Sequence, residues 1–279
     1  MPIHDQGYQH YTGDRIPNGR AWWVIARAGL VERLRERRFL ALMLFAWSPF
    51  AVRAVELYLG ATILRSGMFA ATEGTFQSFL SQQRLFVFFI TIYAGAGLIA
   101  SDRQSNALQI YLSKPIVRYE YIAGKVLTLI VLLVAVTWLP AMMLLLLQIL
   151  FSGSVNFLLD HPRLVPAITV VSIIQVGLAA LMMVALSSLS RSRRFAAMVY
   201  AGVVLLGAAV DRLLEGVTGH AAWVLVSPQN TALLLSDVAF GGEAASGYLI
   251  LLAAVAVGGV MLASLLILER HVRAVEIIS

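Results

Sequence analysis

Long apolar runs separated by short polar segments dominate the hydrophobic pattern of this chain. Six of these runs approach or exceed the roughly 20 residues that an α-helix needs to cross the hydrocarbon core of a membrane. They predict spans near residues 39–59, 85–100, 121–151, 165–189, 195–212 and 247–268. Pro140 lies inside the third run, where its missing backbone N–H predicts a kink. The pattern therefore predicts an all-α, polytopic membrane protein with six transmembrane helices.

A seventh apolar stretch, residues 221–240, differs from the six runs because polar residues divide it. The sequence Ser227-Pro228-Gln229-Asn230 lies in its middle, and glycines flank it. Pro and Gly punctuate helices, so the pattern predicts two short helices that enter one face of the membrane and return. We expect a reentrant element on the outer side, before the last span.

Residues 20–38 combine tryptophans with arginines directly before the first span. Trp23, Ala26, Leu30 and Leu34 recur at helical spacing, which predicts an amphipathic helix on the cytoplasmic surface in contact with lipid. A charged topology anchor with no further role is the alternative. The expected organisation is a tail at 1–19, this interfacial helix at 20–38, and a transmembrane domain at 39–279.

Composition supports the membrane class and excludes several others. Hydrophobic residues make up 59% of the 279 residues and charged residues 13%, against about 25% charged in soluble domains. The spans leave no room for a separate catalytic domain. The chain has no cysteine, which excludes disulfides, thiol catalysis and Cys-ligated zinc.

The net charge of +6 is informative through its placement. Lys and Arg gather before the first span, in the second and fourth loops and in the tail, whereas the opposite side holds few, among them Arg84 and Arg212. By the positive-inside rule, both termini lie in the cytoplasm of a bacterial inner membrane. We interpret the basic excess as a topology signal and expect no nucleic-acid partner. No signal peptide is expected, since the first apolar run begins near Phe39.

The polar segment 101–125 separates the second and third spans on the cytoplasmic side. Ser101 is a candidate helix cap, and Asp102 suits the positive end of a helix dipole. An apolar stretch from Ala107 to Leu112 follows, and Pro115 ends it. This predicts a short amphipathic helix across the end of the bundle. Its apolar face contacts either another protein or the bundle itself.

Signatures of catalysis are missing from the sequence. No G-x-x-x-x-G-K-[ST] motif occurs, since Gly124-Lys125 lacks the preceding glycine, and no H-E-x-x-H motif occurs. All five histidines lie outside the predicted spans, and the serines at 187–192 have no histidine partner. We therefore expect no enzyme activity, metal or cofactor in this chain.

Four polar residues within the predicted spans are candidates for a translocation path: Arg53, Glu56, Gln148 and Gln175. Arg53 and Glu56 are three residues apart on one helix face, so an ion pair is the simpler interpretation. The two glutamines are equally suited to hydrogen bonds between helices.

The segment 101–125 resembles the corresponding junction of type 2 ATP-binding-cassette permeases. In that family an acidic residue is followed by Gly-Thr, an apolar helix, Ser-x-Pro, an arginine and Gly-Lys. The counterparts here are Asp102, Ser105-Asn106, Ala107 to Leu112, Ser113-Lys114-Pro115, Arg118 and Gly124-Lys125. Ser105-Asn106 departs from Gly-Thr. The surface helix, the six spans and the element before the last span also look like this family, so the resemblance covers nearly the whole chain.

The resemblance implies the transmembrane half of an exporter, coupled to a separate ABC ATPase subunit that binds ATP and Mg²⁺. A second permease, identical or paralogous, would complete the unit. The implied ATPase contacts in this coupling helix are Asp102, Leu108, Tyr111, Leu112, Lys114, Pro115 and Arg118, with a possible second contact at Arg191, Arg193 and Arg194. The alternative is a scaffold or force-transmitting subunit that works with an ATPase on envelope proteins. A secondary carrier or channel is disfavoured because charged residues do not recur near the midplane of several spans.

Overall fold

The computed structural model describes residues 20–60, 72–105, 117–152, 156–242 and 246–272, and this part of the chain is helical without strands. Six helical segments are long and apolar enough to cross a membrane, which confirms the six predicted spans. They are Arg37–Leu59, Glu73–Gln104, Arg118–Phe151, Leu164–Leu189, Arg193–Thr218 and Gly247–His271.

Two spans are longer than the apolar runs predicted. Helix α4 (Glu73–Ile90) begins at residue 73 and not near 85, and α11 (Arg193–Thr218) continues past 212. The prediction failed at α4 because its first half is polar in composition. The structure supplies partners for some of those polar groups: the buried Gln83 donates a hydrogen bond from Nε2 to the carbonyl oxygen of Ala46 at 3.0 Å. Arg84, expected beside an outer loop, therefore lies inside α4.

Prolines mark the interruptions of two spans. The first span is divided at Trp47 into α2 (Arg37–Ala46) and α3 (Ser48–Leu59), with Pro49 in the first turn of α3. The third span is divided into α7 (Arg118–Val134) and α8 (Trp138–Ser152), and Pro140 lies in the first turn of α8. Proline cannot donate the helical hydrogen bond to the residue four positions earlier. The predicted kink at Pro140 is confirmed.

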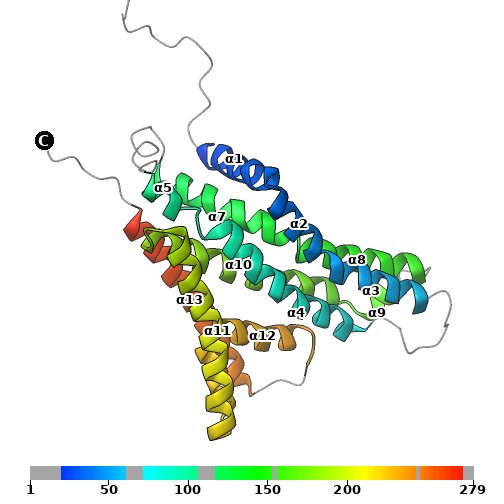
Figure 1. The fold of residues 1–279 in the computed structure, drawn as a ribbon. Helices are drawn as coiled ribbons and strands as arrows, with labels where there is room; N and C mark the ends of the chain where they lie inside the picture. The colour runs from blue at the N-terminus through cyan, green and yellow to red at the C-terminus, as the bar shows by residue number, and fades with distance from the viewer. Residues whose placement is uncertain (1–19, 61–71, 106–116, 153–155, 243–245, 273–279) are drawn as a thin grey trace, which may run out of the picture.

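Helix α10 (Leu164–Leu189) is the central element and the most buried of the six spans. It contacts α4, α7, α8, α11, and also α13 (Gly247–His271). Two apolar clusters pack along it, one containing Met183 and the other Ile168. Figure 1 shows α11 and α13 diverging on one side from α3, α4 and α8 on the other.

The two ends of the bundle differ. At one end, hereafter the α5 end, lie α1 (Ala21–Arg35), α5 (Ala100–Gln104) and the start of α7 (Figure 1). The opposite, far end holds the short α9 (Asn156–Asp160). The second span reaches α5 through a π-helical turn, η3 (Thr91–Gly95).

The segment before the last span forms two short helices, as its sequence predicted. These are the 3₁₀-helix η4 (Ala221–Val226) and α12 (Pro228–Ala239), joined at Ser227. The Ser227 hydroxyl accepts a hydrogen bond from the backbone N–H of Asn230 and caps α12. Both helices contact α11 and α13. Their depth in a membrane stays a prediction.

Helix α1 packs on α7, and the contact of its apolar stripe with lipid stays a prediction. Its buried residues are Ile25, Ala26 and Arg33, whereas Trp23 and Leu34 of the expected apolar stripe are exposed. The contact is close because both helices contribute a glycine. A Cβ at Gly124 would lie 2.8 Å from the Trp22 carbonyl oxygen, and one at Gly29 would lie 2.9 Å from Thr128 Oγ1. Helix–helix approach, and not the position of tryptophans, selected the buried face.

Candidate functional site

The polar segment 101–125 is described at its two ends, in α5 and α7. Its middle, residues 106–116, lies outside the described residues. Five of the predicted ATPase contacts fall there, and their roles stay predictions: Leu108, Tyr111, Leu112, Lys114 and Pro115. Arg118 begins α7 and is exposed.

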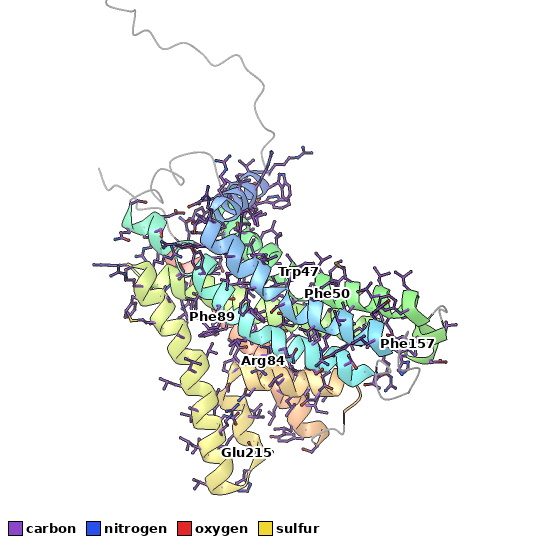
Figure 2. All side chains as sticks on the ribbon, turned by 45° about the vertical axis from the view of Figure 1, so that its right-hand side comes forward. Trp47, Phe50, Arg84, Phe89, Phe157 and Glu215 are labelled. Carbon is purple, nitrogen blue, oxygen red and sulfur yellow. The ribbon has the colours of Figure 1, made fainter. Side chains whose placement is uncertain are left out.

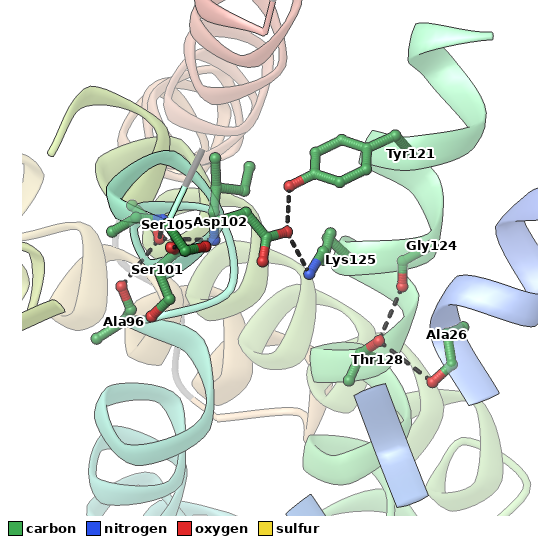
Figure 3. Close-up of polar contacts among 12 residues, drawn as sticks. Ala26, Ala96, Ser101, Asp102, Ser105, Tyr121, Gly124, Lys125 and Thr128 are labelled. Carbon is green, nitrogen blue, oxygen red and sulfur yellow. Dashed lines mark hydrogen bonds and ion pairs between the residues drawn. The ribbon is translucent and has the colours of Figure 1, made fainter. Parts of the chain in front are cut away.

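An ion pair joins the two described ends of this segment. The Lys125 ammonium lies 2.7 Å from Asp102 Oδ2, and the Tyr121 hydroxyl donates a hydrogen bond of 2.7 Å to the same oxygen (Figure 3). The side chains of Lys125 and Asp102 are only 14% and 18% exposed. Charge-assisted bonds away from water are the stronger kind. Asp102 thus holds α5 against α7 and has partners within its own chain.

A serine of the fourth span anchors the start of α5. The buried Ser187 Oγ accepts hydrogen bonds from the backbone N–H groups of Ile99 and Ala100, at 3.1 and 3.0 Å, and donates one of 2.9 Å to the Ala96 carbonyl. The prediction that Ser101 caps this helix is wrong, because α5 begins one residue earlier and Ile99 occupies the cap position. A hydroxyl can accept two bonds and donate one, so Ser187 satisfies three backbone groups.

We predict that Ser187→Ala destabilises the protein by about 1–3 kcal/mol, since it leaves buried backbone groups without partners. Thermal unfolding of the purified protein in detergent measures this loss. Ser246→Ala is the control, because Ser246 is exposed and its side chain makes no cap hydrogen bond to the described residues of α13. Equal losses for the two variants would contradict the role assigned to Ser187.

A second polar chain links α1, η3 and α11 at the α5 end. Arg193 donates a hydrogen bond of 2.7 Å to the Tyr93 carbonyl, and the Tyr93 hydroxyl donates one of 2.9 Å to Glu36. Glu36 in turn pairs with Arg33 at 3.0 Å. Arg193 therefore serves an intramolecular contact, whereas Arg191 and Arg194 are exposed.

The predicted path residues lie on three helices, α3, α8 and α10, and their role in a translocation path stays a prediction. Arg53 pairs with Glu56 at 2.8 Å and also donates to Ser78 Oγ at 3.2 Å, which confirms the ion-pair interpretation. Gln148 is half-buried on α8. Gln175 is buried on α10, and its Nε2 has no hydrogen-bond partner among the described residues. It lines a groove together with Arg84 and Gln229.

Sequence reasoning missed Arg84, which it assigned to the edge of a loop. The buried positions Phe76, Phe79, Leu80, Gln83 and Phe86 follow the three- and four-residue spacing of a helix face. That spacing was the available signal, and it continues the helix well before the apolar run. Within the described ranges, no group of three His, Asp or Glu residues could hold a metal ion.

Comparison with models of protein families assigns the chain to a family. The model of the ABC-2 family transporter protein matches residues 23–268, which is most of the chain. A comparison with curated proteins finds no match. The match includes five spans in full, the sixth up to residue 268, and the segment that carries Asp102 and Lys125. This chain is therefore a multi-pass membrane subunit that belongs to the ABC-2 transporter family.

Proposed function

We propose that the chain is the transmembrane subunit of an ATP-driven exporter in the bacterial inner membrane, with both termini in the cytoplasm. A separate ABC ATPase subunit binds ATP and Mg²⁺ and hydrolyses ATP. A second permease, identical or paralogous, completes the unit. Membership of the ABC-2 family supports this proposal, as does a sequence without a P-loop.

The ion pair between Asp102 and Lys125 is the observation that carries the proposal. An ATPase can drive a helix bundle only through a contact that does not yield when the ATPase moves. The pair fixes the helices on both sides of residues 106–116. Because α5 and α7 are held together, a force that an ATPase applies between them moves both helices.

Two routes lead from these helices into the bundle. On one side, Ser187 connects the start of α5 to α10, which contacts most of the other spans. On the other side, α7 contacts both α10 and, at Gly124, α1. A displacement of residues 106–116 would reach the central helix by both routes. In this way, ATP binding in the partner would favour one of two arrangements of the spans.

The double substitution Leu108→Asp and Leu112→Asp tests the proposal. It places two charges on the predicted apolar docking face, and we expect ATPase co-purification to fall on the order of tenfold or more, as for loss of an interface hot spot. The permease itself should still insert in the membrane. Quantification of the co-purified P-loop subunit per permease measures the effect.

Leu159→Asp is the matched control, since Leu159 is 74% exposed on α9 at the far end. It should leave ATPase association unchanged. Undiminished association of the double variant would refute the docking assignment. Stimulation of ATPase activity by a transported substrate in lipid discs would separate an exporter from a subunit that only transmits force.

A further inference from the structure

A groove in the wall of the bundle is lined by an arginine, Arg84, that makes no direct ion pair with the residues that the structure describes. It has a volume of about 620 Å³ and lies among α4, α10, α11 and α12. Helix α11, which forms one wall, contacts η3 and α5 and then diverges from α3, α4 and α8 (Figure 1). This volume is in the range of sites that take drug-sized molecules.

The groove wall is apolar except at one end. Leu85, Val87, Phe88 and Phe89 of α4 face Val204 and Leu205 of α11 across it. Figure 2 shows Arg84 and Phe89 on α4, beside the descending α11. The polar end is formed by Ser81, Arg84, Gln175 and Gln229, and no carboxylate lines the groove.

Arg84 makes no ion pair or hydrogen bond with any residue that the structure describes, although it is half-buried. Its position is 11 residues into α4, or about 16 Å along the span from the far end. A charged residue at such a place is costly and usually marks a functional site. The free guanidinium needs an anion.

The nearby acidic residues are already bonded to amides. Asp237 attracts Arg84, but Asp237 Oδ1 accepts a hydrogen bond of 2.5 Å from Gln77. Asp211 Oδ2 accepts one of 2.6 Å from Asn230. Arg212 adds a second positive charge that acts on Arg84. Neither acidic residue lines the groove, so the groups that its polar end presents include the guanidinium of Arg84 and the side-chain amides of Gln175 and Gln229.

Gln175 is a second, independent observation. It is only 7% exposed, and its Nε2 has no hydrogen-bond partner in the part of the chain that the structure describes. A buried amide N–H₂ without an acceptor is unfavourable unless a ligand or water supplies one. A second, very small cavity beside the groove is also lined by Gln175 and Arg84, so the two donors face the same space.

We propose that this groove binds an amphipathic anion, with its carboxylate or phosphate group at Arg84 and Gln175 and its apolar body along α4 and α11. The inference rests on the proposed function, because it names the substrate class of the exporter. The guanidinium of Arg84 favours a ligand with an anionic group, and the apolar wall of the groove favours a ligand with a hydrocarbon chain.

Binding of a fluorescent long-chain fatty acid tests the proposal. The purified permease is placed in discs of zwitterionic lipid, and binding above that of empty discs is measured. Wild type should bind the acid at least about tenfold more tightly than its neutral methyl ester, which cannot form the charged hydrogen bonds. This comparison needs no variant. Equal binding of acid and ester would overturn the proposal.

Substitutions locate the anion within the protein. Arg84→Gln should weaken acid binding about 10- to 100-fold, whereas Arg84→Lys, which keeps the charge, should retain most of it. Arg163→Gln is the matched control, because Arg163 is exposed at the far end and outside the groove. Equal binding by wild type and Arg84→Gln would exclude Arg84 as the anion site.

Two further comparisons separate the possible sources and the two proposals. If phosphatidylglycerol in the discs displaces the acid from wild type, the anion is a membrane lipid headgroup; if it does not, the anion is a free amphipath. Both results support an anion in the groove. The assay contains no ATPase, so failure of binding leaves the ATPase association test intact, and failure of that association leaves the binding result intact.

Discussion

Asp102→Asn is expected to lower the free energy of unfolding by about 2–3 kcal/mol and to uncouple ATP hydrolysis from the spans. Loss of one partner of a buried ion pair costs about 3–5 kcal/mol, and the lower value allows for the 14% and 18% exposure of the two side chains. The neutral amide also accepts a weaker bond from Tyr121. Thermal unfolding, and ATPase stimulation in the assembled transporter, measure the two effects.

A double-mutant cycle with Lys125→Met separates the pair from the effects of each residue alone. Coupled residues in contact typically show interaction energies of about 0.5–3 kcal/mol. Glu56→Gln is the control carboxylate, because Glu56 is 41% exposed in its pair with Arg53 and should contribute less than about 1 kcal/mol. Additive effects of Asp102→Asn and Lys125→Met would show that the pair carries no coupling.

Gly124→Leu is expected to displace α1 from α7. A side chain at this position would place its Cβ 2.8 Å from both the Ile25 Cβ and the Trp22 carbonyl oxygen. A backbone oxygen cannot rotate away, so the helix itself must move, at a cost of about 1–3 kcal/mol. The glycine that the family motif contains therefore has a packing reason in this structure.

Cysteine labelling measures the displacement of α1. The chain has no cysteine, so Thr128→Cys introduces a unique thiol at a residue buried against α1. A membrane-permeant maleimide should label it slowly in the parent and much faster in combination with Gly124→Leu. Gly202→Leu is the control, because a Cβ at Gly202 meets no atom within 4 Å. Similar labelling rates with either glycine substitution would contradict the close contact at Gly124.

The fold was predictable to the extent that each element depends on its own residues. An apolar run of sufficient length favours the membrane wherever its neighbours lie, so the six spans and the kink at Pro140 followed from the sequence. The first half of α4 did not, because its polar residues are stabilised by distant partners. Gln83 bonds Ala46, 37 residues away, and Gln77 bonds Asp237, 160 residues away.

The face of α1 that packs on α7 was not predicted from the sequence. The spacing of Trp23 and Leu34 indicated an apolar stripe, and the helix has apolar residues on more than one face. Which face is buried depends on the surface offered by the partner helix. Gly124 and Thr128 of α7 provide a shallow surface that accepts Ile25 and Ala26.

By itself the sequence determined the membrane class, the number of spans, the polar segment 101–125 and its resemblance to ABC permeases, because hydropathy and motifs are properties of contiguous residues. Only the tertiary structure decided that Asp102 pairs with Lys125, that Ser187 caps α5, and that Arg84 lines a groove. A hydrogen bond or an ion pair depends on the positions of atoms in two helices. Those positions are set by packing, which no single segment of the chain specifies.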